Sequence, residues 1–541
     1  MTAQAAPLVA VRRREWLLVG LIASAAAAAL ALIGPDGGDT PAHLYRTFLV
    51  DQGVYLWDNL WFAGQYPLVS YSLLYYLPAA LVGNVPVVIA SVIASAVLFE
   101  RVCRHEWGDA AMWPARVFAV LAAGPLFTGT YSYAAGFATL LATLAALQSG
   151  RVSTAVGCAA LTLGFSPLAF VFLALVLAAL VVARRPLGRK AALFGGGLVV
   201  AITIEVTALH LFPTGGRYPF RLFELAVVLV VAGLGLAIAS RAPRGGVLAA
   251  LFGCWLAASV LLFLVPEPVG ENVTRLRSIV FPLMLLTALL ARFRPRSLVV
   301  LGLGFALAYN VVPYAATVPA RLDDTRASQE AFWAPAIGFL REHRALEFRV
   351  EVVPTYDHWE SYWVPRSGFA LARGWFRQQD LAENRVLYRQ PLSPAAYRAW
   401  LRRMSIRYVL LPRAPLAQKG AIREARLLRS GGAGLPVVFR STDWTIYQFR
   451  DARPLLTGPA EARVWAFAHD HVAGWVGARG TYRLGVRHMP YWRVQGPVCI
   501  QRAPDGMTWL RARRRGGFVL TLDGGPGALV RSPLRAGGAC S

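Results

Sequence analysis

The sequence predicts an α-helical polytopic membrane domain of about eleven transmembrane helices, followed by exported α/β and β-sandwich domains. Of the 541 residues, 56% are hydrophobic and only 16% are charged, which is more apolar surface than a soluble protein of this length needs. The charge is also uneven: residues 1–319 carry 21 Lys+Arg and 12 Asp+Glu, whereas residues 320–541 carry 34 and 17. We therefore place a membrane domain in residues 1–319 and water-exposed domains after it.

Eleven apolar stretches have the length and composition of transmembrane helices or come close to it. The first follows the basic run Arg12–Arg14 and has the shape of a signal sequence, but more spans follow, so we interpret it as an uncleaved helix. Stretch 152–165 is short, and Ser166-Pro167 indicates that it is tilted or re-entrant. The predicted spans are 16–33, 83–99, 112–128, 131–148, 152–165, 167–183, 191–212, 222–240, 246–265, 276–292 and 297–315.

Basic clusters between the spans orient the chain, because cytoplasmic loops of membrane proteins are enriched in Lys and Arg. The clusters fall on one side if the N-terminus is cytoplasmic, which makes residues 316–541 extracytoplasmic in a multi-pass protein of the cell membrane. The segment Tyr66–Gly83 would break this phase as a full span, so we interpret it as a helix that lies along or dips into the outer surface. The clusters are Arg12–Arg14, Arg101/Arg104, Arg151, Arg184–Lys190, Arg241/Arg244 and Arg292–Arg296.

The predicted exported half divides near residue 455. Residues 320–455 mix amphipathic helical runs with short β runs, which favours a small α/β domain. Residues 456–541 consist of short β runs separated by Gly or Pro, which favours an antiparallel β-sandwich. The helical runs are Phe332–Arg344 and Ala395–Met404, and the β runs are Phe348–Val353, Tyr408–Leu411, Arg463–Phe467, Tyr482–Arg487, Thr508–Arg511 and Phe518–Leu522.

The cysteines and the basic run near the C-terminus limit the chemistry. Cys499 and Cys540 would form a disulfide if this part is exported, whereas the other three cysteines lie in or beside apolar spans. No CxxC or His-rich spacing suggests a metal, and we expect no cofactor. We interpret Arg511–Arg515 as a solvated face or a contact with anionic head groups rather than as a nucleic-acid site.

The loop after the first span, Gly34-Pro-Asp-Gly-Gly-Asp39, gathers reactive groups where a membrane protein would meet water. In one interpretation Asp36 and Asp39 are turn residues, with Asp39 as the N-cap of a helix that has Pro41 in its first turn. In the other, one of them is a catalytic general base, because a carboxylate at a protein-lined boundary is partly desolvated. Both interpretations stay open at this point.

His43 and Arg46 lie one helical turn apart and so share a face if a helix begins at Pro41. Two cationic groups there suit a phosphate or pyrophosphate head group. The alternative is that Arg46 extends its side chain to the membrane interface.

Other predicted exported loops add polar groups that suit substrate binding. His210 ends the seventh span, with Glu205 at membrane depth, and Arg217 follows in the same loop. Arg275 and Arg277 precede the tenth span on the side where arginine is disfavoured, which points to anion binding as much as to a helix end.

The predicted α/β domain contains two segments rich in Trp, Arg and acids. They are His358-Trp-Glu360-Ser-Tyr-Trp363 and Leu371-Ala-Arg373-Gly-Trp-Phe-Arg-Gln-Gln-Asp380. Glu360 and Arg373 could bind sugar hydroxyls beside aromatic faces, or belong to ordinary contacts between domains.

Taken together, the acidic first loop, the number of helices and the trailing exported domain resemble the GT-C (C-type) superfamily of polytopic glycosyltransferases. At finer grain, the motifs resemble a bacterial membrane family labelled "6-pyruvoyl-tetrahydropterin synthase-related", a label that does not imply pterin chemistry. The resemblance covers roughly residues 16–450. The motifs are Gly37-Gly-Asp-Thr-Pro-Ala-His-Leu-Tyr-Arg46, Trp61-Phe-Ala-Gly-Gln-Tyr-Pro67, Tyr71-Ser-Leu-Leu-Tyr75, Phe212-Pro-Thr-Gly-Gly216 and Ala372–Asp380.

The GT-C resemblance implies an inverting transfer of a sugar from a polyprenyl-phosphate donor to a glycan or other cell-envelope acceptor. By position, Asp39 or Asp36 would deprotonate the acceptor, although this chain has Asp-Gly-Gly-Asp in place of an adjacent acidic pair. Two other functions stay open. A lipid or polysaccharide transporter would move its substrate without covalent change, and a non-catalytic envelope scaffold would recruit partners through its exported domains.

Overall fold

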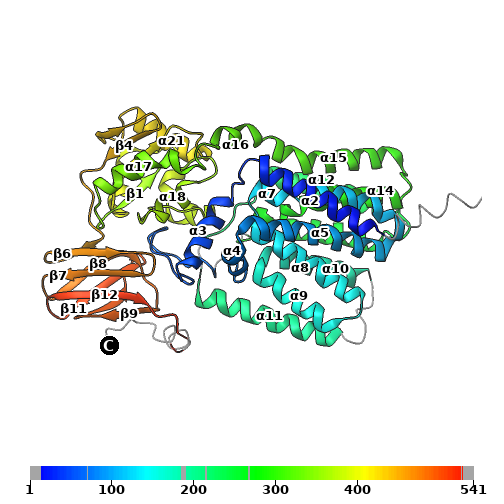
Figure 1. Ribbon diagram of the computed structural model, residues 1–541, viewed down its shortest axis with the longest axis horizontal. Coiled ribbons are helices and arrows are strands. Elements are labelled where there is room, and N and C mark those ends of the chain that lie inside the picture. The colour runs from blue at the N-terminus through cyan, green and yellow to red at the C-terminus, as the bar shows by residue number, and fades with distance from the viewer. Residues whose placement is uncertain are drawn as a thin grey trace, which may run out of the picture. The chain divides into compact units, whose positions relative to one another are not determined.

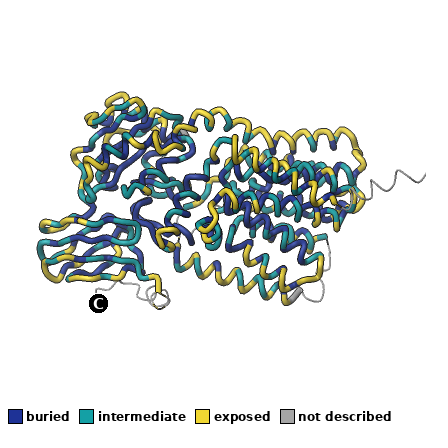
Figure 2. The backbone as a smooth tube through the Cα atoms, in the orientation of Figure 1, coloured by how far each residue is buried: buried dark blue, intermediate teal, exposed yellow. Residues whose placement is uncertain are grey.

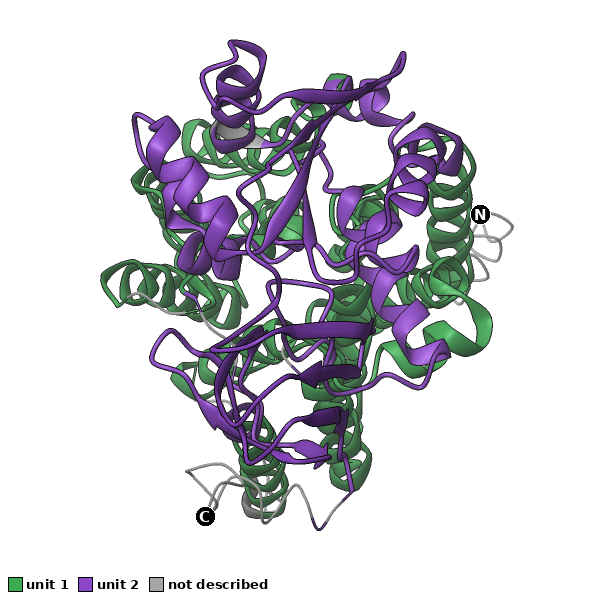
Figure 3. Cartoon of the chain, turned by 90° about the vertical axis from the view of Figure 1, so that its left-hand side faces the viewer, with its two compact units in different colours: residues 1–40, 71–208, 217–319 green, residues 41–70, 209–216, 320–541 purple. Residues whose placement is uncertain are grey.

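The computed structural model describes residues 14–69, 71–183, 191–213, 216–265, 268–525 and 527. The chain forms two compact units, each built from discontinuous segments (Figure 3). The first, the helical unit, comprises Met1–Thr40, Tyr71–Ala208 and Arg217–Pro319. The second, the mixed unit, comprises Pro41–Ser70, Leu209–Gly216 and Ala320–Ser541.

A helix or helix pair coincides with each of the eleven predicted spans (Figure 1). Among the described residues, seven helical stretches are long and apolar enough to cross a membrane, and α9 and α10 are shorter apolar helices. The chain is thus a multi-pass membrane protein with β-sheet domains after its helices. The span helices are α2 (Glu15–Ile33), α5 (Asn84–Trp107), α6 (Met112–Leu121), α7 (Gly124–Thr128), α8 (Tyr131–Gln148), α9 (Val152–Phe165), α10 (Pro167–Val182), α11 (Ala191–Leu211), α12 (Leu222–Ala239), α13 (Gly246–Leu264), α14 (Arg277–Leu290) and α15 (Arg296–Ala315).

Local sequence explains where these helices break. The α9–α10 boundary falls at Ser166, whose hydroxyl accepts a hydrogen bond from the Ala169 N–H while Pro167 occupies the first turn of α10. The predicted surface helix over 66–83 is confined to α4 (Tyr76–Val82), and residues 66–69 and 71–75 form turns, bends and irregular backbone. The basic residues 12–13 and 184–190 lie outside the described residues.

The mixed unit contains a four-stranded sheet of order β1-β2-β4-β3, in which β1 and β2 are parallel and the other pairs are antiparallel. Its core includes Val409, Tyr397 and Trp400, which are almost fully buried. Its strands are β1 (Arg349–Val352), β2 (Ile406–Pro412), β3 (Val437–Arg440) and β4 (Trp444–Gln448). The helices in and before this region are α16 (Val318–Asp324), α17 (Glu330–Glu342), α18 (Glu360–Arg366), α19 (Arg377–Glu383), η3 (Arg385–Tyr388), α20 (Pro394–Arg403) and α21 (Gln418–Arg429).

Two further four-stranded antiparallel sheets follow, of order β10-β11-β8-β5 and β6-β7-β12-β9. Strands β9 and β12 alternate more and less buried residues, as expected when one face of a sheet is covered, whereas β7, β8 and β10 each have three consecutive buried residues. Figure 2 colours the backbone of these sheets by burial. Cys499 in β10 is disulfide-bonded, and its predicted partner Cys540 lies outside the described residues. The strands are β5 (Leu456–Thr457), β6 (Ala462–Phe467), β7 (His471–Val476), β8 (Gly480–Arg487), β9 (Trp492–Gln495), β10 (Val498–Arg502), β11 (Met507–Ala512) and β12 (Gly516–Leu522).

One part of the predicted transmembrane domain belongs to the mixed unit instead. Segment 41–70, which contains most of α3 (Thr40–Asp51), packs with residues after 320, as does segment 209–216. Residues 57–63 are all buried, and the Trp61 indole N–H donates to the Ser361 carbonyl over 3.0 Å. We call residues 54–66 the clasp loop. Its backbone and side chains contact both the region of the sheet β1-β2-β4-β3 and the two antiparallel sheets that follow. This grouping could not be predicted, because the hydropathy of a segment indicates whether it is buried but not which distant segment it packs against.

Candidate functional site

The helical unit brings Asp39 and Arg275 together. An Arg275 Nη2 atom lies 3.4 Å from Asp39 Oδ2, and the two side chains are 26% and 16% exposed. Tyr71 and Tyr218 also interact with the Arg275 guanidinium. The site therefore holds a carboxylate beside a cation, and both groups remain accessible enough to meet a ligand.

Backbone contacts fix the position of Asp39. Its N–H donates to the Thr128 carbonyl over 3.1 Å. The backbones of the two loops approach so closely at Gly37 and Gly129 that neither residue could carry a side chain. A Cβ on Gly37 would lie 2.0 Å from Gly129 N, and a Cβ on Gly129 would lie 2.5 Å from Thr40 N. Gly129 also has a φ of +77°, a conformation that favours glycine. The two glycines thus allow the approach that positions Asp39.

A buried hydroxyl pair lies next to this carboxylate. Thr40 Oγ1 and the Tyr131 hydroxyl are 3.0 Å apart, and both residues are buried. Asp36 and Asp39 both act electrostatically on Tyr131. Asp36 itself is exposed, so Asp39 is the more enclosed of the two predicted catalytic residues.

The other predicted cations of the helical unit lie in different settings. Arg217 is exposed, and Arg277 begins α14 with its guanidinium carbon 5.6 Å from the centre of the Tyr309 ring. Arg221, which was not predicted, pairs with Glu271 over 2.8 Å. The structure therefore shows direct contact with Asp39 for Arg275.

An apolar cavity of about 360 Å³ opens among α5, α8, α10, α13 and α14 of the helical unit. Leu276, the residue after Arg275, forms part of its wall. Glu106 and Gln148 are the polar members of a wall that is otherwise largely hydrocarbon. Its apolar wall residues include Phe99, Phe137, Phe172, Leu251 and Leu283. Such a cavity suits an apolar chain rather than a polar sugar.

His43 and Arg46 do not form the accessible cation pair that their spacing suggests. Both belong to the mixed unit and are 1% exposed, and the Arg46 guanidinium carbon lies 4.5 Å from the centre of the Phe376 ring. Arg46 therefore makes a buried cation–π contact instead of reaching the membrane interface. His210 is exposed at the end of α11 and also belongs to the mixed unit.

Glu360 supports a turn and does not project from the surface. It is 5% exposed, and Oε2 accepts hydrogen bonds from Thr355 N and Oγ1 over 3.1 and 3.0 Å. His358 Nδ1 lies 3.0 Å from Oε1. Both carboxylate oxygens are thus engaged by residues of the same turn, so Glu360 forms neither an open sugar-binding group nor a contact between domains.

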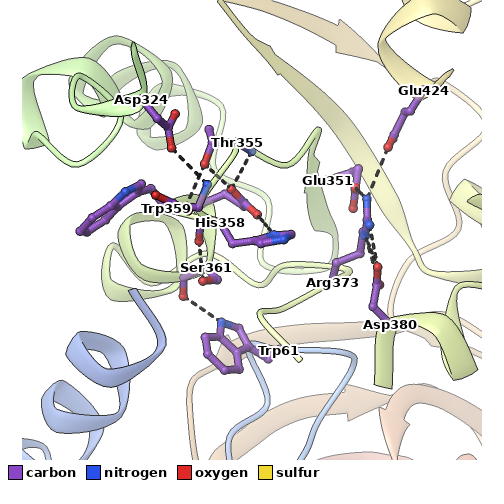
Figure 4. Close-up of polar contacts among 12 residues, drawn as sticks. Trp61, Asp324, Glu351, Thr355, His358, Trp359, Ser361, Arg373, Asp380 and Glu424 are labelled. Carbon is purple, nitrogen blue, oxygen red and sulfur yellow. Dashed lines mark hydrogen bonds and ion pairs between the residues drawn. The ribbon is translucent and has the colours of Figure 1, made fainter. Parts of the chain in front are cut away.

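Arg373 lies in a buried cluster with three carboxylates. It donates to Asp380 over 2.6 Å, and its Nη1 lies 3.3 Å from Glu351 and 3.5 Å from Glu424 (Figure 4). Burial raises the pKa of Glu351 and Glu424, and their mutual repulsion adds to this for Glu351. Burial opposes ionisation of Asp380 as well, but the Arg373 guanidinium and its hydrogen bonds lower that pKa below its usual value. The cluster joins β1, α19 and α21 and is structural.

No group of three or more His, Cys, Asp or Glu side chains is arranged to hold a metal ion among the residues that the structure describes. The residues that position Asp39 were not predicted as site residues. Their sequence signal was the short link Thr128-Gly-Thr-Tyr131 between two spans, which lies on the same predicted side as the Asp39 loop.

Comparisons with known proteins give distant structural likenesses only. Neither a protein-family profile nor a curated protein sequence matches the chain. The arabinofuranosyltransferase AftD from Mycobacteria is similar over 81% of this chain, with 16% identity and a TM-score of 0.48, and the chain spans 40% of its length. ArnT from Cupriavidus metallidurans is similar over 82% of this chain and 98% of its own, with 13% identity and a TM-score of 0.40. Both TM-scores are below 0.5, so neither likeness assigns an activity.

Proposed function

We propose that the chain is a membrane glycosyltransferase of the GT-C type, which moves a sugar from a polyprenyl-phosphate donor to a cell-envelope acceptor on the extracytoplasmic face. The single observation that carries the proposal is the ion pair between Asp39 and Arg275, 3.4 Å apart in the helical unit. The resemblance to the 6-pyruvoyl-tetrahydropterin synthase-related family adds no activity to this. The proposed topology keeps the N-terminus in the cytoplasm and residues 316–541 outside.

In the proposed reaction, the Asp39 carboxylate accepts the proton of an acceptor hydroxyl. The acceptor oxygen attacks the anomeric carbon from the face opposite the lipid phosphate, so a new C–O bond forms while the bond to the phosphate oxygen breaks. The phosphate leaves with the electron pair, and the Arg275 guanidinium, which parts from Asp39 when the sugar enters between them, stabilises the growing negative charge. The anomeric configuration is inverted, and the chain's own residues supply the acid–base and electrostatic groups.

The apolar cavity supports the choice of donor. Leu276 lines it directly after Arg275, so one short segment presents both a cation for phosphate and a hydrocarbon wall for an isoprenoid chain. Arg217, exposed in the same unit, is a second group proposed to attract the anion. His43 is not retained in this role because it is buried in the mixed unit.

The test is transfer of labelled sugar from polyprenyl-phosphate donors by the full-length protein in proteoliposomes. Asp39→Asn is expected to lower the rate by about 10²- to 10⁴-fold, the usual contribution of a positioned general base. Arg275→Ala should lower it as well, with partial recovery in Arg275→Lys, because lysine restores the charge without the planar fork.

Asp51→Asn is the matched control, since Asp51 is an exposed carboxylate at the end of α3, the helix that begins directly after Asp39. Its activity should equal that of the wild type. Full activity in both Asp39→Asn and Asp36→Asn would reject the assignment of the base. Movement of the labelled lipid across vesicles without any covalent product would favour a transporter.

A further inference from the structure

The outer face of the sheet β6-β7-β12-β9 leaves one indole open to solvent. Trp465 in β6 is 52% exposed, and it is the one large apolar side chain exposed to this degree among the described residues of β5–β12. Its neighbours Val464 and Phe467 point inward and are buried. A tryptophan this exposed on a sandwich whose core is otherwise covered needs an explanation, because burying the ring would be favourable.

A β-bulge places this indole. The register between β6 and β7 shifts between Val464 and Ala466, so Trp465 is the extra residue of the bulged strand. Bulges re-aim the side chain at the extra position. Atom Cη2 of the Trp465 indole lies 3.1 Å from the position that a Cβ of Gly517 would take.

Gly517 lies on β12, which is two strands away from β6 across β7. Because neighbouring strands are about 4.8 Å apart, the indole must lie flat across the sheet to reach it. Part of the ring is therefore covered near Gly517, and about half of the Trp465 side chain stays open to solvent. Trp475, which pairs with Gly517 and with Arg463, adds a second, half-buried indole beside it.

Polar side chains surround these rings on the same face. Arg493 and Gln495 of β9 are exposed and lie opposite Thr521 and Val519 of β12. Arg463 is exposed on the other edge. The face thus combines flat aromatic surface with hydrogen-bonding groups, and it lacks the broad apolar patch that a stable protein interface needs.

We propose that this face binds a glycan, with one sugar ring stacked on Trp465. A sugar presents C–H groups on the faces of its ring, which suit an indole surface, and hydroxyl groups at its edge, which suit Arg and Gln side chains. The site is separate from Glu360 and Arg373, whose polar atoms are engaged internally. The inference goes beyond the proposed function, because a glycan-binding face can operate with or without sugar transfer.

The test measures binding of short gluco-, manno- and arabino-oligosaccharides to the full-length protein in nanodiscs, by intrinsic tryptophan fluorescence and by retention on the immobilised sugars. At least one series is expected to bind the wild type. Trp465→Ala should weaken that binding about tenfold or more, and Trp465→Phe should retain part of it because a flat ring remains. Since Trp465 is exposed, neither variant should lower the thermal unfolding temperature appreciably.

Trp113→Ala is the matched control, because Trp113 is 55% exposed in the helical unit. It should bind sugars as the wild type does. Gly517→Val adds a side chain where the indole rests and should weaken binding although Trp465 is intact. Unchanged affinity in Trp465→Ala, equal loss in Trp113→Ala, or no binding of any of the three series to the wild type would overturn the proposal.

Discussion

The Asp39 loop and the clasp loop belong to one predicted exported segment, yet they differ in burial and in role. Asp39 is partly exposed and contacts Arg275, whereas Asp58 in the clasp loop is fully buried. Asp58 accepts a hydrogen bond from the Tyr45 hydroxyl over 2.9 Å and lies 3.0 Å from His469 Nδ1. The comparison shows that the neighbouring residue types alone do not separate a catalytic aspartate from a structural one. The burial of the carboxylate is needed to do so.

The largest expected effect comes from replacing Asp58, the buried one of these two aspartates. Asp58→Ala removes the acceptor of Tyr45 and the partner of His469, so the mixed unit should lose about 3–5 kcal/mol of unfolding free energy. The measurement is chemical denaturation followed by tryptophan fluorescence. Asp51→Ala is the control and should change stability by no more than about 0.5 kcal/mol. A stable Asp58→Ala protein would show that the clasp loop is not structural.

A second change acts on the support of the Asp39 loop. Gly129→Ala places a Cβ 2.5 Å from Thr40 N and 2.8 Å from Asp39 N, so the loop must shift. If Asp39 is the base, transfer should fall about 10²-fold, as expected for a displacement of about 1 Å.

Gly53→Ala is its control, because Gly53 has nearly the same φ, +74°, but its Cβ would meet nothing within 4 Å. Gly53→Ala should lower stability, because alanine is strained at this positive φ, but it should keep the wild-type transfer rate. Equal activity in the two variants would show that Gly129 does not position Asp39.

A third prediction concerns pH and the buried acids of the mixed unit. The folded-state pKa values of Glu351 and Glu424 are raised, so the unfolded chain releases these protons first as the pH rises. Their contribution to stability is complete below the unfolded pKa of about 4.3 and is lost as the pH rises toward the folded values. Asp380 acts in the opposite sense, because its lowered pKa costs stability only when the pH falls below about 3.9.

Between pH 4 and 8, Glu351 and Glu424 should therefore lower the stability of the mixed unit as the pH rises, whereas His488, whose pKa burial lowers to about 4, acts in the opposite sense. Thermal unfolding across this range measures the dependence. Glu351→Gln should flatten this dependence, because glutamine does not ionise. Glu383→Gln is a control at a less buried carboxylate in α19. The same pH dependence in Glu351→Gln as in the wild type would contradict the raised pKa of Glu351.

The smallest expected effect is that of Asp36→Asn. Asp36 is exposed, so its replacement should change stability by no more than about 0.5 kcal/mol. A transfer rate close to that of the wild type would sharpen the assignment to Asp39. A loss as large as that of Asp39→Asn would move the base to Asp36.

Features that depend on local pattern could be predicted from the sequence. The eleven apolar stretches coincide with helices, and the β runs Tyr482–Arg487 and Phe518–Leu522 lie within β8 and β12. Apolar runs and period-two alternation are set by each segment's own surroundings, so they can be recognised within a short window. The boundaries of such elements follow from the same signals, as at Ser166-Pro167.

Features that depend on distant partners could not be predicted. The spacing of His43 and Arg46 gave their common helix but not their burial, because the residues that cover them come from elsewhere in the mixed unit. The contact of Gly37 with Gly129 likewise depends on two loops meeting. For Asp39 and Arg275, the sequence supplied the residue types, and the fold supplied the distance.

The composition of the mixed unit has a consequence for its synthesis. Arg487 Nε donates to the carbonyl of Phe62, a residue that the ribosome makes 425 residues earlier. At about 5–20 residues per second, translation takes on the order of tens of seconds to cover that interval. Until the end of this interval the clasp loop lacks at least one of its partners, so part of its buried surface stays uncovered while the chain is being made.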